Sequence, residues 1–158
     1  MDVDTNPWLS DRQQRVWRQY LHAQEELNAA VGRQLNQDWG MSTPDFQVLV
    51  RLSESPHGRV RIVELADTLL WERSRLSHHL TRMQKRDLIL RQDCPDDRRG
   101  AFAALTTTGR ELLEQAAPGH AALVLQLVFD PLSEADLAKV DALSASLLSR
   151  LAAHRTLG

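Results

Sequence analysis

The stretch of sequence that decides the fold is IVELADTLLWERSRLSHHLTRMQKRDLILRQDCPDDRRGAFAALT, residues 62–106. It opens with two apolar stripes at helical spacing that are separated by a short break. The stripes are Ile62, Leu65, Ala66 and Leu69, then Leu76, Leu80 and Met83. Two aliphatic segments, 88–92 and 101–105, follow and have the composition of antiparallel strands. This order predicts a helix-turn-helix followed by a β-hairpin wing.

The polar side of the second predicted helix points to nucleic acid. A polar face alone is typical of any surface helix, but this one holds cationic, hydroxyl and imidazole groups and no acidic residue. Such groups donate hydrogen bonds to phosphates and to base edges in the major groove. The residues predicted to contact DNA from this helix are Arg73, Ser74, Arg75, Ser77, His78, Thr81, Arg82 and Lys85.

The connection between the two predicted strands is polar and rich in arginine. Residues 95–100, Pro-Asp-Asp-Arg-Arg-Gly, are expected to form a turn too long for a tight hairpin. A guanidinium is flat, permanently charged and weakly hydrated, so it suits the narrow, electronegative minor groove of DNA. The predicted helix and wing together would bracket one DNA backbone.

Ordered motifs in this region resemble the wing of the MarR family of winged helix-turn-helix transcriptional regulators. Leu88-Ile89-Leu90-Arg91 precedes Asp97-Arg98-Arg99-Gly100, and Leu105-Thr106-Thr107-Thr108-Gly109-Arg110 follows, similar to the family's Asp-x-Arg-Gly and Leu-Thr-x-x-Gly-Arg. The likeness extends over about residues 13–151, with 41–49 similar to the family's second-helix entry and 131–137 similar to the start of its last helix.

The resemblance implies roles for the four wing residues Asp97, Arg98, Arg99 and Gly100. Arg99 would enter the minor groove, and Asp97 would orient it through a charge-assisted hydrogen bond. Arg98 would contact a phosphate. A solvated turn pair of little energetic worth is the alternative for Asp97 and Arg99.

Two positions depart from the family pattern. Asp87 stands just past the recognition helix, where many relatives have Gly, and Asp tolerates a left-handed cap less well than Gly but better than most residues. Trp71 occupies the turn before the recognition helix, where a small or polar residue is commoner. We expect Trp71 to fill the core, with a place in a ligand pocket as the alternative.

Long helices are predicted at both ends of the chain. Ser10 would cap a helix over 9–37, Thr106 or Thr107 one that runs towards Leu127 with a kink at Pro118-Gly119, and Ser133 a third. The apolar stripe of the third helix is Leu137, Val140, Leu143, Leu147 and Leu151.

These elements predict a mainly α protein with a small β-hairpin wing (α+β). The whole chain, 1–158, would be a single domain, with a winged helix-turn-helix DNA-binding lobe at 41–105 and dimerisation helices at 9–38 and 107–154. The terminal helices are richer in leucine and alanine than a monomer needs, which favours an isologous homodimer over a closed monomeric core. Its two recognition helices would enter successive major grooves of a pseudo-palindromic operator.

Length, charge and localisation signals agree with such a regulator. The 158 residues carry a net charge of −2, but residues 71–100 hold eight Arg or Lys against five Asp or Glu, or +3. No stretch approaches the roughly 18 to 20 apolar residues of a membrane span, and the start is acidic with no apolar signal core. The single cysteine, Cys94, suits a reducing compartment and is expected to be an ordinary thiol near the surface. The protein is therefore predicted to be cytoplasmic, with no membrane contact.

The sequence contains no recognisable catalytic or metal-binding pattern. His78 and His79 are adjacent and would point to different faces of a helix, so they cannot chelate one metal as an i, i+4 pair would. Cys94 has no partner base at a recognisable spacing. We predict that the protein is not an enzyme and has neither a cofactor nor a metal.

The resemblance also implies a small, often aromatic or phenolic effector, held in a cleft between the dimer helices and the DNA-binding lobe. Indoles that could stack on such a ligand, and cations that could pair with it if it is anionic, are Trp17, Trp39, Trp71, His22, Arg51 and Arg61. For each of them a structural role is the alternative.

The sequence thus predicts a sequence-specific homodimeric regulator of transcription that binds double-stranded DNA. We expect a repressor that is released by a small molecule or by a redox change. The alternative is a winged-helix module for protein interaction or architecture without base readout, which would be expected to present apolar anchors over 74–85.

Overall fold

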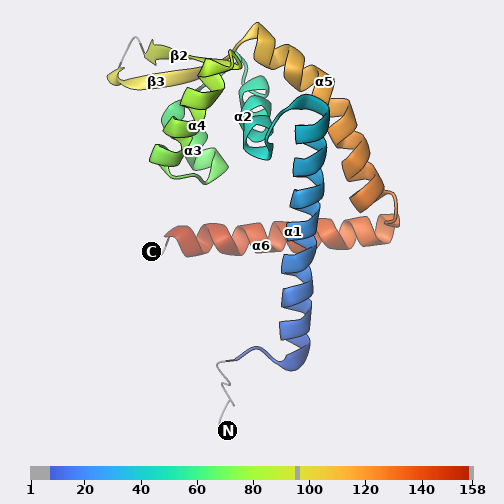
Figure 1. The fold of residues 1–158 in the computed structure, drawn as a ribbon. Coiled ribbons are helices and arrows are strands. Elements are labelled where there is room, and N and C mark those ends of the chain that lie inside the picture. The colour runs from blue at the N-terminus through green and yellow to red at the C-terminus, as the bar shows by residue number, and fades with distance from the viewer. Residues whose placement is uncertain (1–7, 95–96, 157–158) are drawn as a thin grey trace. The chain divides into compact units, whose positions relative to one another are not determined.

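The computed structural model describes residues 8–94 and 97–156, and of residues 97–99 and 156 it describes the backbone only. The element order is α1, α2, β1, α3, α4, β2, β3, α5, η1, α6 (Figure 1). The chain separates into two compact units, Met1–His120 and Ala121–Gly158, so the boundary between them falls within α5. The prediction that 1–158 is one domain stays a prediction.

The first two helices begin at reciprocal caps. Helix α1 spans Asp11–Trp39 and begins at Ser10 as predicted, with Ser10 and Gln13 bonding to each other's backbone N–H groups. It ends at Gly40, whose φ of 58° is the left-handed conformation that glycine adopts readily. Helix α2 spans Thr43–Ser53, and Ser42 and Asp45 cap its start in the same reciprocal way.

The two predicted apolar stripes form the helix-turn-helix. Helix α3 spans Ile62–Leu69 and helix α4 spans Arg73–Lys85. Most of the stripe side chains are buried: Leu65 and Ala66 on α3, and Leu76, Leu80 and Met83 on α4. Both helices end in a left-handed residue that is not glycine, Leu70 (φ 55°) and Asp87 (φ 56°). The departure from the family pattern at Asp87 therefore leaves the left-handed cap in place.

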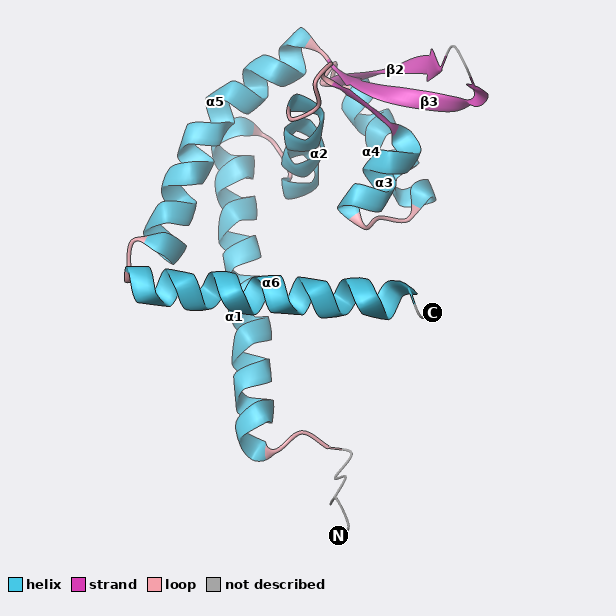
Figure 2. Ribbon diagram, turned by 180° about the vertical axis from the view of Figure 1, so that it is seen from behind, coloured by secondary structure: helices cyan, strands magenta, loops and turns pink. Residues whose placement is uncertain are grey.

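The sheet has three antiparallel strands in the order β1-β3-β2, and Figure 2 shows β2 and β3 as the long hairpin. Strand β2 spans Ile89–Cys94 and β3 spans Asp97–Leu105, with Ile89 opposite Leu105 and Cys94 opposite Asp97. Strand β1, Arg59–Arg61, pairs with β3 and was not predicted.

The predicted long turn between the strands is wrong for its second half, because β3 begins at Asp97 and not at Ala101. The register shifts between Asp93, which lies opposite Ala101, and Cys94, which lies opposite Asp97. Residues 98–100 therefore form an irregularity within the strand. The arginine-rich segment lies on the hairpin itself.

Helix α5, Thr107–Val124, closes the base of the hairpin. Thr106 accepts a hydrogen bond from the Gly109 backbone N–H, which confirms Thr106 as the cap. The hydroxyls of Thr106 and Thr108 donate to the backbone oxygen and the carboxylate of Asp87, respectively. These bonds fix the end of the recognition helix to the start of α5.

The second unit continues α5 through the π-helix η1, Leu125–Phe129, into α6, Glu134–Thr156. The predicted cap is present, since Ser133 accepts from the Asp136 backbone N–H and donates to the Asp136 carboxylate. The predicted apolar stripe of α6 is exposed on the single chain, from 38% at Leu137 to 65% at Leu143.

One helical run, Thr107–Phe129, is long and apolar enough by length and composition to cross a membrane, with a mean hydropathy of 1.2. This corrects the expectation that no stretch comes near that limit. The first half of the run packs into the winged lobe through Leu113 and Ala116. We interpret it as a helix of the fold and not as a membrane span. The fold itself, mainly helical with a small antiparallel wing, is confirmed.

Candidate nucleic-acid interface

Helix α4 presents a cationic surface to solvent. The exposed members of the predicted set are Arg73, Ser74, Arg75, His78, Thr81, Arg82 and Lys85, and Ser77 is half-buried. The opposite side is anchored by the buried Leu76, Leu80 and Met83. Because α4 itself contains no acidic residue, no carboxylate on the helix neutralises this surface. Such a face can donate to phosphates and base edges together.

One side of α4 is tied to the wing by an arginine that the sequence prediction did not include. Nη2 of Arg91, on β2, donates to the Ser77 backbone oxygen at 2.7 Å and to Thr81 Oγ1 at 3.2 Å. Arg91 is exposed, so its charge adds to that of the recognition helix. The contact fixes the direction of two predicted DNA-binding residues relative to the hairpin.

The four predicted wing residues lie on β3. The side chains of Asp97, Arg98 and Arg99 lie outside the described residues, so their roles stay predictions. Gly100 is half-buried in β3. The backbone places all four on the hairpin that extends from the same lobe as α4 (Figure 2).

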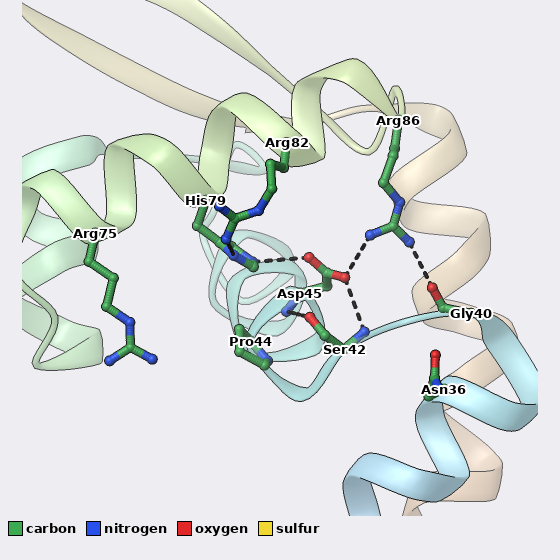
Figure 3. A pocket seen from close by; sticks show the side chains of 9 residues that line it. All are labelled: Asn36, Gly40, Ser42, Pro44, Asp45, Arg75, His79, Arg82 and Arg86. Atoms are coloured by element: carbon green, nitrogen blue, oxygen red, sulfur yellow. Dashed lines mark hydrogen bonds and ion pairs between the residues drawn. The ribbon is translucent and has the colours of Figure 1, made fainter.

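On its other side, α4 borders a pocket of about 490 Å³. The pocket lies among the end of α1, the start of α2 and one flank of α4, and three of its side chains are arginines (Figure 3). Its lining residues are Asn36, Gly40, Ser42, Pro44, Asp45, Arg75, His79, Arg82 and Arg86. Two predicted DNA contacts, Arg75 and Arg82, therefore flank this pocket.

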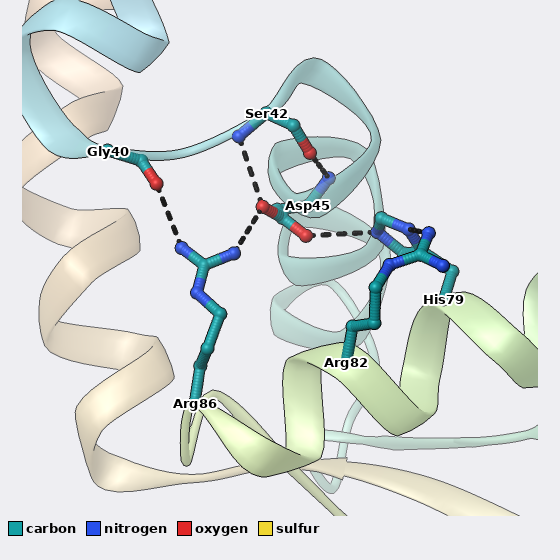
Figure 4. Close-up of polar contacts among 6 residues, drawn as sticks. All are labelled: Gly40, Ser42, Asp45, His79, Arg82 and Arg86. Carbon is teal, nitrogen blue, oxygen red and sulfur yellow. Dashed lines mark hydrogen bonds and ion pairs between the residues drawn. The ribbon is translucent and has the colours of Figure 1, made fainter.

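Asp45 lines this pocket and is the centre of a polar network (Figure 4). Its side chain is 5% exposed, and its carboxylate lies at hydrogen-bonding distance from three groups. They are Arg86 Nη1 at 2.7 Å, the Ser42 backbone N–H at 3.0 Å and His79 Nε2 at 3.0 Å. Arg86 also donates to the Gly40 backbone oxygen at 2.9 Å. One carboxylate thus joins the end of α1, the start of α2 and α4.

The network also keeps Asp45 ionised. Burial acts to raise the pKa of Asp45, since a charged group loses its hydration. The contacts with His79, Ser42 and Arg86, that with His79 foremost, outweigh burial and hold the pKa of Asp45 well below its ordinary value of 3.8. The carboxylate is therefore charged at neutral pH, and it accepts hydrogen bonds from the Ser42 backbone N–H and from Arg86.

His79 connects Asp45 to two of the predicted DNA-binding arginines. Its Nδ1 lies 3.0 Å from Nη2 of Arg82. The edge of its ring meets Trp71, with 5.5 Å between ring centroids and an interplanar angle of 89°. The Arg75 guanidinium lies over Trp71, 4.6 Å from the ring centroid. Trp71 is half-buried and packs on the buried His79, with Arg75 over its ring, so its expected role as a core plug stays a prediction.

The structure does not gather the predicted ligand-binding residues into one site, and none of the six lines the described pocket. Trp17 is exposed on α1 and stacks on Tyr20, and His22 is exposed further along the same helix. Trp39 is the last residue of α1 and is half-buried. Their role in binding an effector stays a prediction.

Neither of the two candidate arginines lines the described pocket. Arg51 forms an exposed pair with Glu54 on α2, at 3.2 Å. Arg61, on β1, donates to Cys94 Sγ at 3.3 Å and lies over the Phe102 ring. Cys94 is 6% exposed, so the expectation of a thiol near the surface is wrong. Arg61 thus reaches from β1 to the thiol on β2.

Sequence reasoning missed the functional candidates Asp45, His79, Arg86 and Arg91. A signal for Asp45 exists, because Ser42-x-x-Asp45 has the spacing of a capping box. His79 sits beside the apolar stripe of α4, and only the fold brings it to Asp45 from 34 residues away. Among the described residues there is no group of three or more His, Cys, Asp or Glu that could hold a metal ion.

Comparison with known proteins gives consistent matches. A model of the MarR family matches residues 39–100. AbsC of Streptomyces coelicolor, a MarR family transcriptional regulator, is 37% identical with a TM-score of 0.87, over 92% of this chain and 98% of that one. Sco3205 of the same organism, a MarR family transcriptional regulator solved in complex with DNA, is 41% identical with a TM-score of 0.87, over 91% of each chain. The HTH-type transcriptional regulator MhqR of Bacillus subtilis (strain 168) is 22% identical over 120 residues, 76% of this chain and 81% of that protein.

Proposed function

The chain belongs to the MarR family of DNA-binding transcriptional regulators, and from this premise we propose that it is a cytoplasmic, homodimeric repressor of a pseudo-palindromic operator. In this proposal α4 reads the major groove, and the hairpin places Arg99 in the adjacent minor groove. A small molecule, aromatic or phenolic in character, relieves repression.

The observation that carries the proposal is the exposed surface of α4. Arginine, lysine, histidine and hydroxyl side chains cover it, while the apolar side of the helix is fully buried. A protein-interaction module would need large apolar side chains as anchors. The described exposed face of α4 includes none. Base readout is therefore favoured over the alternative of an architectural module.

The dimer is supported by apolar side chains that the single chain leaves exposed at both ends. On α1 these include Val16 and Trp17, at 59% and 52%, and on α6 they include Leu143 and Leu148, at 65% and 66%. Apolar side chains exposed along a helix are typical of protein interfaces when they form one patch. An isologous dimer would bury the helix faces and present two α4 helices to successive major grooves.

Effector release needs a ligand that binds the DNA-incompetent dimer more tightly than the DNA-competent one. A differential of about 100-fold, roughly 2.7 kcal/mol, would relieve most repression if the two states are close in energy. An effector would therefore raise the melting temperature of the free protein and weaken its DNA complex, which a screen of aromatic acids and phenols would detect.

Selection of bound sequences from random duplex DNA tests the proposal. We expect an enriched motif with two-fold symmetry and half-site centres about one helical turn apart. Arg75→Ala should relax the preference at defined base pairs, whereas Arg150→Ala, which removes an exposed arginine from α6, should leave the motif unchanged. If the unaltered protein enriches no motif, specific base readout is wrong.

A further inference from the structure

The contact between Arg82 and His79 fixes the protonation pattern of the imidazole. A guanidinium has only donors, so Nδ1 of His79, 3.0 Å from Arg82 Nη2, must be the acceptor of this hydrogen bond. A neutral imidazole that accepts at Nδ1 carries its hydrogen on Nε2. Nε2 lies 3.0 Å from Oδ1 of Asp45, within ion-pair distance but not in the alignment of a hydrogen bond. The arginine therefore selects this tautomer, and the negative charge of the neighbouring Asp45 carboxylate favours it as well.

This arrangement holds Arg82 by one end only. Arg82 is exposed, and its described contact is the one from Nη2 to His79. No carboxylate among the described residues pairs with it, so the charge of Arg82 stays uncompensated. The remaining N–H groups of a guanidinium anchored in this way form a fork that matches the oxygens of a phosphate.

We propose that Asp45 and His79 form a positioning unit that preorganises Arg82 for contact with a DNA phosphate. His79 does not touch DNA in this proposal; it acts through Arg82, and Asp45 acts through the tautomer and orientation of His79. The inference rests on the proposed function, because it assumes that α4 meets DNA.

The expected effect follows from the mobility of a long side chain. A free arginine loses rotamer freedom when it binds a phosphate, whereas Arg82 is already held at Nη2 before DNA arrives. Removing the anchor should weaken DNA binding by about two- to tenfold, the range for ordering one flexible side chain at an interface. Because the contact is to the backbone, the loss should be similar for operator and unrelated sequences.

Two substitutions of His79 test the roles of its two ring nitrogens separately. His79→Asn can place its carbonyl oxygen near the position of Nδ1, so it keeps an acceptor for Arg82 and loses the contact with Asp45. His79→Gln can place its amide near the position of Nε2, so it keeps the contact with Asp45 and loses the acceptor. Both remove the same ring from the same buried site. We expect the weaker DNA binding from His79→Gln, with His79→Asn recovering most of the loss.

A double-mutant cycle with Arg82→Ala then tests whether His79 acts through Arg82. Arg82→Ala alone should weaken binding and reduce the slope of log affinity against log salt by about 0.9, the value for one lost phosphate contact. His79→Gln should leave that slope unchanged, since the arginine is still present. In the Arg82→Ala background, His79→Gln should have no further effect on affinity. Equal losses in both backgrounds, or equal losses from His79→Gln and His79→Asn, would overturn the proposal.

Two further measurements keep the outcomes distinct. If the His79 variants fail to fold by circular dichroism, long-range ¹H–¹⁵N spectra of the unaltered protein decide, because hydrogen on Nδ1 instead of Nε2 contradicts the proposal. Failure of the unaltered protein to bind any duplex would refute the proposed function. A third outcome would refute this inference alone. In that outcome the unaltered protein binds DNA normally, Arg82→Ala weakens binding, and the loss from His79→Gln adds to the loss from Arg82→Ala.

Discussion

Asp45 shows how one buried charge can organise three helices. Its carboxylate caps α2, bonds to Arg86 beyond the end of α4, and meets His79 on the buried side of α4. Arg86 in turn caps the end of α1 through the Gly40 oxygen. Because each partner would be left without its acceptor, removing the carboxylate should cost more than removing an exposed one.

The first prediction is that Asp45→Asn destabilises the protein by about 1–3 kcal/mol at pH 7. The pKa of Asp45 is lowered in the folded state, so its contribution is fully present well above 3.8 and is lost as pH falls through the folded pKa. The difference between parent and variant should therefore shrink below pH 3.8. Denaturant unfolding at pH 7, 4 and 2.5 measures it.

The matched control is Asp67→Asn, which changes an exposed aspartate of α3. Its effect on unfolding free energy should stay within about 0.5 kcal/mol at neutral pH. A loss for Asp45→Asn that is the same at pH 7 and pH 2.5 would mean that packing, and not the charge, explains the effect.

Single residues also show where the sequence was insufficient. The stripe Leu76, Leu80 and Met83 predicted the buried side of α4 because apolar periodicity is a local property. His79 is buried beside a carboxylate from another helix, and Cys94 is buried beside Arg61 of β1. Neither partner is close in sequence. Buried polar groups are therefore the part of the candidate site that periodicity could not reveal.

Among the elements, α5 and the start of β2 are held in close contact by a glycine. A Cβ on Gly109 would overlap the backbone oxygen of Leu88, and that backbone cannot move aside as a flexible side chain could. Thr106 and Thr108 bond to Asp87 at the same point. The end of the recognition helix, the hairpin and α5 thus meet at one junction.

The second prediction is that Gly109→Ala destabilises the protein by about 1–3 kcal/mol or more, although alanine is the better helix former. Its control is Gly119→Ala in the same helix, where the new Cβ would meet only the end of the Gln34 side chain at 3.1 Å. Thermal unfolding compares the two. Similar melting temperatures for both variants would show that the junction is not rigid.

The third prediction concerns the link between wing and recognition helix. Arg91→Gln removes the charge-assisted bond to the Ser77 oxygen, so operator affinity should fall by about 1 kcal/mol. Because Arg91 is exposed, the melting temperature should change little. Fluorescence anisotropy titrations measure the affinity. An Arg91→Gln protein that binds as tightly as the parent would make the bridge a bystander.

The elements themselves were predictable to different degrees. Helices α3 and α4 and the caps at Ser10, Thr106 and Ser133 follow from local patterns, and the structure confirms them. Strand β1 has three residues, two of them arginines, and no alternation that would mark it. Its partner is β3, about 40 residues later, so only the completed sheet defines it. The irregular register at Asp93 likewise arises from the pairing and has no local signal.

In the whole molecule, positive charge is concentrated on the exposed face of α4, and the remaining residues carry an excess of negative charge. The exposed face of α4 is cationic while the net charge is −2, so non-specific attraction to DNA is limited and specific contacts carry more of the discrimination. Binding through two copies of α4 would multiply those contacts without raising the net positive charge. The exposed face of α4 can therefore bind a two-fold symmetric operator tightly only if the protein is a dimer.

The last prediction is that Leu143→Glu together with Leu151→Glu converts a dimer into a monomer and abolishes tight operator binding. Both side chains are exposed apolar members of the α6 stripe, and a dimer interface would force the two new carboxylates into an apolar contact. Ala142→Glu, on the opposite side of α6, is the control and should stay dimeric.

Analytical ultracentrifugation measures the assembly state of each protein. Titrations with a DNA that holds one half-site and with a DNA that holds two half-sites then test the consequence for binding. The monomer should bind both DNAs equally weakly, whereas the dimer should prefer the DNA with two half-sites. A parent protein that sediments as a monomer at micromolar concentration, or a double variant that remains dimeric, would contradict the role assigned to α6.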